Sequence, residues 1–174
     1  MYEAHIEILG HYEWTPGVRI LQYTGHYQQL IQLFAPTCNF FELSCWPEKT
    51  EVLEDAEQKI CSKGTLQRIH DPTIPGITPV CLVSELSPTI VDELLMKPFD
   101  EYGRIKWFGL SLGKAFDSTS KEHTPKSIIL ELSHWGEEMH IYKMSEEEFK
   151  VVQAIFSYSH QEEVSLHISK SGDF

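Results

Sequence analysis

Residues 109–113 have the spacing of a nucleophile motif. Gly109-Leu110-Ser111-Leu112-Gly113 matches G-x-S-x-G, in which glycines let a serine sit on a sharp turn from a strand into a helix. A strand is predicted before it, at 105–112, but residues 114–126 lack the apolar stripe of a following helix. The acid and histidine of a triad are assigned only by exclusion, as Asp117 with His134 or His140. A serine hydrolase acting through Ser111 is therefore the third alternative, and a glycine-flanked strand explains the motif better.

A second group with possible chemistry is His134, Glu138 and His140, since imidazole and carboxylate are competent zinc ligands. Two histidines six residues apart across a predicted turn do not form H-E-x-x-H, and the sequence indicates no third ligand. We therefore expect no metal here, and predict that the histidines are solvated or hydrogen-bonded. The neighbouring pair Glu137-Glu138 is predicted to be surface charge near a hairpin turn.

The cysteines do not indicate a metal or redox site. The gaps between them are not those of C-x-x-C motifs, and buried free thiols are predicted. The four residues are Cys38, Cys45, Cys61 and Cys81.

Charge and hydropathy exclude some classes of function. The 174 residues carry 26 acidic and 14 basic side chains, a formal net charge of −12, and no three bases are clustered. A chain with this negative charge is repelled by a phosphate backbone, so nucleic-acid binding is not expected. No apolar run approaches the roughly 18 residues of a membrane span, and the polar N-terminus does not resemble a signal peptide. A cytoplasmic location is therefore predicted.

The best-specified elements lie between residues 127 and 156. Two strands are predicted at 127–132 and 139–142, joined by a turn at Trp135-Gly136. Ser145 and Glu148 have the S-x-x-E spacing of a capping box, and Met144 and Phe149 that of a hydrophobic staple. An amphipathic helix should follow and pack on the sheet.

The remaining elements complete a fold of the α+β class. Strands are predicted at 2–9, 18–23, 39–46, 79–83, 105–112 and 163–168, and helices from Thr24 to Pro36, at 50–63 and from Ser87 to before Pro98. The punctuated stretch 66–79 is predicted to be a loop. We expect one domain over 1–174: a mixed, mostly antiparallel sheet with about four helices packed on it.

Two blocks of sequence resemble a known family. The first is Ile20-Leu21-Gln22-Tyr23-Thr24, then a short helix and Phe40-Phe41. The second is Cys81-Leu82-Val83-Ser84-Glu85, a helix, Tyr102-Gly103 and Phe108-Gly109-Leu110-Ser111-Leu112-Gly113-Lys114. Over residues 19–116 this order is similar to that of AbiGi-type abortive-infection proteins.

The resemblance implies an α+β fold distantly related to the ADP-ribosyltransferases, and a role in phage defence or toxin control. As an enzyme the chain would use NAD, with Tyr23 and Thr24 lining a nicotinamide pocket and Glu138 polarising the ribose. Gln22 stands where that wider group has a histidine, and Glu138-Met139-His140 where it has a terminal E-W-R. A retained fold with a lost site would leave binding as the function.

We therefore predict an acidic interaction protein without a cofactor, such as an immunity protein or antitoxin, that binds and neutralises a basic toxin or senses a defence component. An ADP-ribosyltransferase-like enzyme using NAD is the alternative. Exposed acids on a helix and a hairpin should steer the basic partner. The predicted partner-binding residues are Glu51, Glu54, Asp55, Glu57, Glu137 and Glu138.

Overall fold

The computed structural model describes residues 1–8, 18–49, 51–60, 67–70, 80–97, 106–114, 128–134, 138–157 and 164–170. Its strands are β1 (Tyr2–Ile8), β2 (Phe40–Cys45), β3 (Gln67–His70), β4 (Val80–Glu85), β5 (Gly109–Gly113), β6 (Ile128–Ser133), β7 (Glu138–Met144) and β8 (Val164–Lys170). Its helices are α1 (Val18–Phe34), α2 (Glu51–Ile60), α3 (Pro88–Ile90) with its π-helical continuation η3 (Val91–Leu95), and α4 (Glu146–Phe156). Short 3-10 turns, η1 (Ala35–Thr37) and η2 (Pro47–Lys49), follow α1 and β2.

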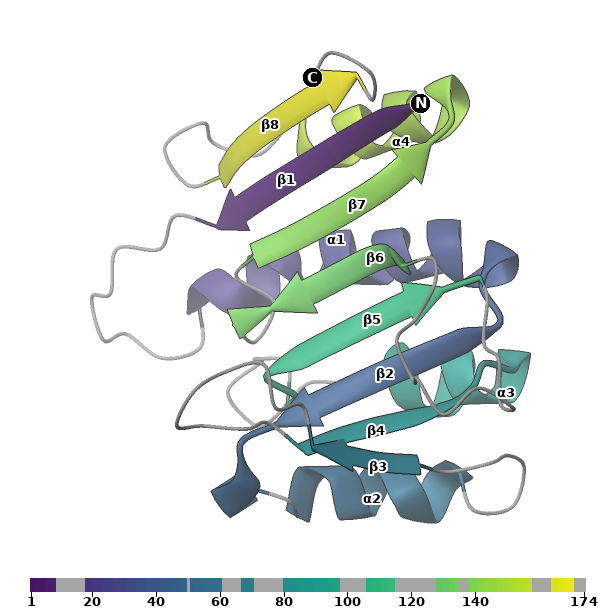
Figure 1. Ribbon diagram of the computed structural model, residues 1–174. Helices are drawn as coiled ribbons and strands as arrows, with labels where there is room; N and C mark the ends of the chain where they lie inside the picture. The colour runs from purple at the N-terminus through teal and green to yellow at the C-terminus, as the bar shows by residue number, and fades with distance from the viewer. Residues whose placement is uncertain are drawn as a thin grey trace.

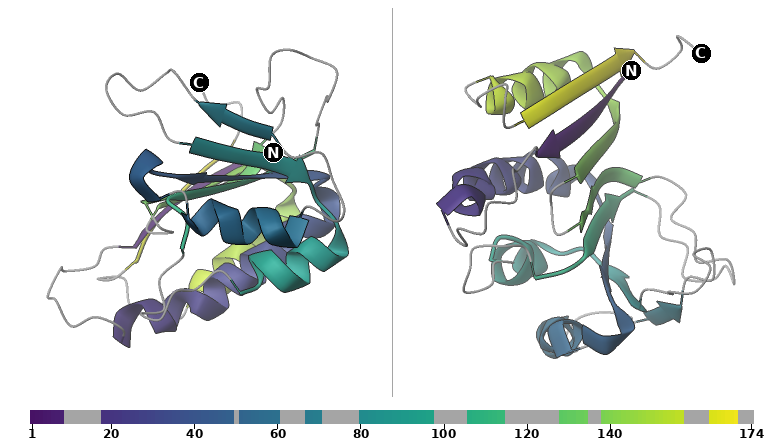
Figure 2. Two further views of the ribbon diagram at one scale, coloured as in Figure 1. Left: turned by 90° about the horizontal axis from the view of Figure 1, so that it is seen from below. Right: turned by 90° about the vertical axis from the view of Figure 1, so that its left-hand side faces the viewer.

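The strands form one sheet in the order β3-β4-β2-β5-β6-β7-β1-β8, and every pairing in it is antiparallel. The described helices all lie on one face of this sheet (Figures 1 and 2). The predicted single α+β domain, with about four helices on a mostly antiparallel sheet, is confirmed.

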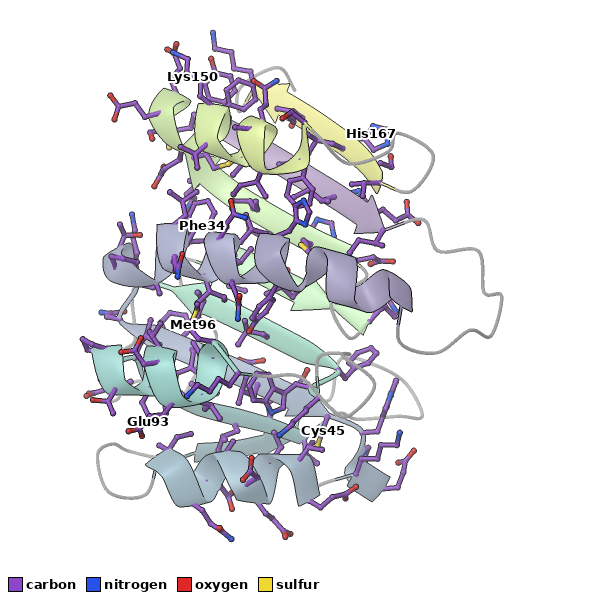
Figure 3. All side chains as sticks on the ribbon, turned by 180° about the vertical axis from the view of Figure 1, so that it is seen from behind. Phe34, Cys45, Glu93, Met96, Lys150 and His167 are labelled. Carbon is purple, nitrogen blue, oxygen red and sulfur yellow. The ribbon has the colours of Figure 1, made fainter. Side chains whose placement is uncertain are left out.

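One apolar core fills the space between the sheet and the helices. Alternate strand residues such as Ala4 and Ile6 point into it, as Met139 and Ile141 do from β7. The helical stripe predicted from 3.6-residue spacing is buried as expected in α1. Its members are Tyr27, Leu30, Ile31 and Phe34, the last of which Figure 3 labels at the end of that helix.

The capping signals of the sequence are also confirmed. Ser145 accepts a hydrogen bond from the Glu148 backbone N–H at 3.2 Å, and the Glu148 carboxylate accepts one from the Ser145 N–H at 2.7 Å. Ser87 caps α3 by accepting from the Ile90 N–H at 3.3 Å. These side chains satisfy donors that the first helical turn leaves without partners.

Two predictions of local structure are wrong, and a third is confirmed only in part. Residues 18–23 are not a strand but the first part of α1, so Thr24 lies inside that helix rather than capping it. A short apolar run is ambiguous, and Ile20 and Tyr23 also stand at helical spacing before Tyr27. The region 66–79 was predicted to lack regular structure, but residues 67–70 form edge strand β3. The strand expected at 105–112 is regular only from Gly109 onward in the described chain.

Candidate functional site

The face of the sheet opposite the helices carries a row of polar side chains across six adjacent strands. His5 is the cross-strand partner of both His167 and His140, and the row continues through β6 and β5 to β2. We call these residues the polar row: His167, His5, His140, Glu131, Ser111 and Glu42. Figure 1 shows α1 behind the sheet, on the side of the apolar core, and because strand side chains alternate between faces, the row lies on the opposite side.

The three histidines of the polar row lie beside one another. The His5 and His140 rings are stacked, with centroids 4.3 Å apart and an interplanar angle of 9°. The His167 ring, on the exposed edge strand, lies 6.4 Å from that of His5. Nε2 of His5 is buried and has no hydrogen-bond partner. This atom therefore lacks the partner that a buried polar group normally has.

Glu138 lies beside His5 and His140. One potential ligand atom each from His5, Glu138 and His140 lies within 4.8 Å of the other two, and all three side chains are half-buried. We call these three residues the His-Glu cluster. Glu138 and His140 are two residues apart on β7 and so share a face, while His5 comes from β1. Glu7 is the cross-strand partner of Glu138 on β1, so two carboxylates are placed opposite each other.

Two neighbours fix the Glu138 carboxylate. Its Oε2 accepts a hydrogen bond from the Ser133 hydroxyl at 3.3 Å and lies 3.2 Å from His134 Nδ1. His134 has a φ of 49°, an uncommon conformation for a residue with a side chain, and its ring packs edge-on against Phe108 at 5.3 Å.

Tyr142 extends the polar face on β7. Its hydroxyl donates to Glu131 Oε2 at 3.1 Å, and its ring lies 6.1 Å from that of His140. Burial, with the adjacent negative charge and hydrogen bond of Glu131, raises the pKa of Tyr142 to about 12. The phenol therefore stays protonated as a donor at neutral pH.

The possible metal ligands that lie together in the structure differ from the group His134, Glu138 and His140 considered from the sequence. Glu138 and His140 are together as expected from their spacing, but the third member is His5, more than a hundred residues earlier in the chain. His134 lies beside the carboxylate instead. The alternation of β1 places His5 on the polar face, yet sequence alone does not say that β1 pairs with β7. The position of His5 beside Glu138 and His140 depends on the β1–β7 pairing and its register, which the sequence does not reveal.

The predicted partner-binding acids fall on two separate surfaces. Glu51, Glu54 and Asp55 are exposed on α2, where Glu57 is half-buried. That helix packs on β2 and β4 on the core side of the sheet. Glu138 is on β7, on the opposite face and three strands from β2. Glu137 lies outside the described residues.

The residues predicted for NAD chemistry are not brought together. Tyr23 and Thr24 are in α1, on the helix-covered face, whereas Glu138 lies on the polar face, so the sheet separates them. The strand expected to present Tyr23 and Thr24 does not form.

Ser111 is not on a nucleophile elbow. The whole of Gly109–Gly113 is strand β5, and Ser111 is the cross-strand partner of Glu42 and Glu131 in its interior. Of the nominated partners, Asp117 lies outside the described residues. Gly109 is explained by packing, because a Cβ there would lie 2.6 Å from the Ser44 hydroxyl oxygen and 3.2 Å from the Leu132 carbonyl oxygen.

Of the cysteines, Cys45 and Cys81 are buried as predicted, Cys38 is half-buried, and Cys61 lies outside the described part of the chain. Burial raises the pKa of the Cys38 thiol, which disfavours its reactive thiolate.

Comparison of the chain with protein-family models, with curated proteins and with solved structures finds no match. Among the described residues, no helix has both the length and the apolar character needed to span a membrane.

Proposed function

We propose that the protein is a cytoplasmic binding protein without catalytic activity, whose acidic α2 surface binds a basic protein partner. The observation that carries the proposal is the division of α2 into two faces. Leu53, Ala56 and Ile60 are buried against the sheet, while Glu51, Glu54 and Asp55 are exposed. Burial of the apolar face holds the backbone positions of these three acids in place on the sheet.

Nearby acids extend this negative surface. α2 contacts η3, and η3 exposes Asp92 and Glu93, the second of which is labelled in Figure 3. Asp55 is 3.9 Å from Lys106, a long and largely solvent-screened ion pair. In the described chain, no ion pair involves Glu51 or Glu54. We call Glu51, Glu54, Asp55, Asp92 and Glu93 the acidic surface.

An acidic surface of this kind acts mainly on the rate of association. It attracts a basic partner over about a Debye length, roughly 8 to 10 Å at ordinary salt, and orients it before contact. The resemblance of residues 19–116 to AbiGi-type proteins supports a toxin or another defence component as that partner. Neutralisation would follow if the bound domain covers the partner's working surface.

The experiment compares two double variants of equal charge. Glu51→Gln/Glu54→Gln removes two exposed charges from the first turn of α2, and Glu146→Gln/Glu147→Gln removes two from the first turn of α4. A basic partner is first co-purified with the tagged chain from its native cells and identified. Association rates are then measured for the wild type and both variants at several salt concentrations.

We expect the α2 variant to associate about threefold to tenfold more slowly, with a shallower dependence on salt, and the α4 variant to resemble the wild type. Equal effects of the two variants would mean that only net charge matters. That result, or an association rate that salt does not change, would contradict the proposed surface.

A further inference from the structure

We propose that the His-Glu cluster (His5, Glu138 and His140) is a binding site for a divalent transition-metal ion, with Zn²⁺ as its preferred occupant. The site lies on the polar face, and α2 lies on the other side of the sheet. The inference therefore goes beyond the proposed partner binding and does not depend on it.

The ligand types select the class of metal. Two imidazoles and one carboxylate suit Zn²⁺ and its neighbours in the transition series, whereas Ca²⁺ and Mg²⁺ prefer sites built from oxygen atoms. Three protein ligands leave one position of a tetrahedral zinc ion open to water or to another ligand. His167, exposed on β8 with its ring 6.4 Å from that of His5, lies outside this ligand set, and its Nε2 is 2.9 Å from the Ser165 hydroxyl oxygen.

The distances are within reach of side-chain motion alone. Zinc ligands lie about 2.0 to 2.2 Å from the ion, so they are about 3.4 Å apart in a tetrahedron. The cluster's ligand atoms are within 4.8 Å of one another, and the β1–β7 register holds their backbones beside each other. Imidazole lone pairs lie in the ring plane, so the parallel His5 and His140 rings cannot both point at one ion. Metal binding therefore requires at least one of these half-buried rings to turn out of the stack.

Two features of the cluster favour binding of a cation. Nε2 of His5 is buried without a hydrogen-bond partner, which costs free energy that a metal bond would recover. Glu7 and Glu138 are opposite each other in the β1–β7 ladder, and like charges in such positions repel. A divalent ion between these strands would satisfy the nitrogen and offset the repulsion.

The neighbours of Glu138 form the kind of outer shell that orients a metal ligand. The Ser133 hydroxyl and His134 Nδ1 both meet Oε2, at 3.3 and 3.2 Å, and they restrict rotation of the carboxylate. His134 is in turn held by its edge-on contact with Phe108. These contacts make His134 a positioning residue for the site.

The test uses the full chain, stripped of metal with a chelator and titrated with zinc chloride by calorimetry. The ligand variants are Glu138→Gln and His140→Gln, which keep a polar side chain of similar length. The matched control is His167→Gln, which removes a histidine from the same row outside the cluster. Histidine ring signals of the wild type are followed by NMR, and the melting temperature of each metal-free variant is recorded to verify folding.

We expect the wild type to bind one zinc ion, with His5 and His140 ring signals shifting together. Each ligand variant should lose at least about a hundredfold in affinity, and His167→Gln less than about threefold. His134→Gln should weaken binding about tenfold while leaving the metal-free melting temperature unchanged, a result that a purely structural role would not give.

Several results would overturn the site. One is absence of zinc binding by the wild type at millimolar concentration. Another is equal loss of affinity in His167→Gln and His140→Gln. A third is zinc binding that survives both ligand variants and disappears in Cys38→Ser, which would assign the metal to a thiol. Each of these leaves the proposed acidic surface untouched, because its own experiment measures association rates in variants of α2.

Discussion

Tyr2 and Phe149 stack with ring centroids 4.5 Å apart and an interplanar angle of 11°, which joins β1 to α4. The spacing of Met144 and Phe149 predicts a hydrophobic staple between these two side chains. Met144 is fully buried, but Phe149 is only half-buried. The stack on Tyr2 is a contact with β1, which the spacing of Phe149 from Met144 does not indicate.

Replacement of this ring should destabilise the protein moderately. We expect Phe149→Ala to lower the free energy of unfolding by about 2 kcal/mol, from part of an aromatic burial and one stacked pair. Urea denaturation of Phe149→Ala, Tyr2→Ala and the double variant gives the coupling between the two rings. Val151→Ala is the control, since Val151 is 44% exposed on the same helix. Fully additive losses in the double variant would show that the stack contributes nothing.

The capping box at the start of α4 offers a second stability test. Ser145→Ala removes the acceptor of the Glu148 N–H and should cost about 1 kcal/mol. Glu148→Gln should cost less than Glu148→Ala, because an amide oxygen can still accept from the Ser145 N–H. Thermal melting of Ser145→Ala, Glu148→Gln and Glu148→Ala measures how much stability each variant loses. If Glu148→Gln were as damaging as Glu148→Ala, charge rather than the hydrogen bond would be responsible.

Two glycines should respond oppositely to the same substitution. Gly109→Ala places a methyl group 2.6 Å from the Ser44 hydroxyl oxygen and should destabilise the sheet by about 1 to 3 kcal/mol. Gly25 is exposed in α1 and a Cβ there meets nothing within 4 Å, so Gly25→Ala should stabilise by about 0.5 to 1 kcal/mol. Chemical denaturation compares them. Adding Ser44→Ala should partly rescue Gly109→Ala, and no rescue would place the clash at the Leu132 carbonyl.

Tyr142 predicts a loss of stability in alkali. Its pKa is raised to about 12 in the folded chain by burial and then by Glu131, from an ordinary value of 10.0. As the pH rises above 10 the unfolded chain releases the phenolic proton first, so this contribution is complete below pH 10 and lost toward pH 12. Ultraviolet titration of tyrosinate should show a late-titrating group that is missing in Tyr142→Phe. The variant's stability should also fall less steeply over that pH range, and an identical decline would contradict the assignment.

Structural features that depend on residues close together in the sequence could be predicted. The Ser145 and Glu148 cap, the buried stripe of α1 and the β6–β7 hairpin each depend on spacings of a few residues, and each is confirmed. The Val18–Tyr23 segment shows the limit of such reasoning. Its branched and aromatic residues favour a strand, but Ile20 and Tyr23 also stand at helical spacing before Tyr27, and the segment is the first part of α1.

The candidate metal site could not have been predicted in the same way. Glu138 and His140 are visibly paired by their spacing, but His5 reaches them only because β1 inserts between β7 and β8. That choice of partners depends on packing of the whole sheet, and a shift of one residue would turn His5 toward the core. The same nonlocal pairing separates Glu138 from the acids of α2.

The position of β1 also affects how the chain must fold during synthesis. β1 leaves the ribosome before the other described strands, while its partners β7 and β8 are made more than a hundred residues later. Until they emerge, Ala4 and Ile6 have no sheet to complete, and both edges of β1 remain open to pairing with other chains. Strands that are so far apart in the sequence pair slowly, so we expect the β1–β7 and β1–β8 pairings to form late in folding. A nascent chain halted before residue 138 would therefore hold β1 unpaired, as a segment exposed to chaperones and to aggregation.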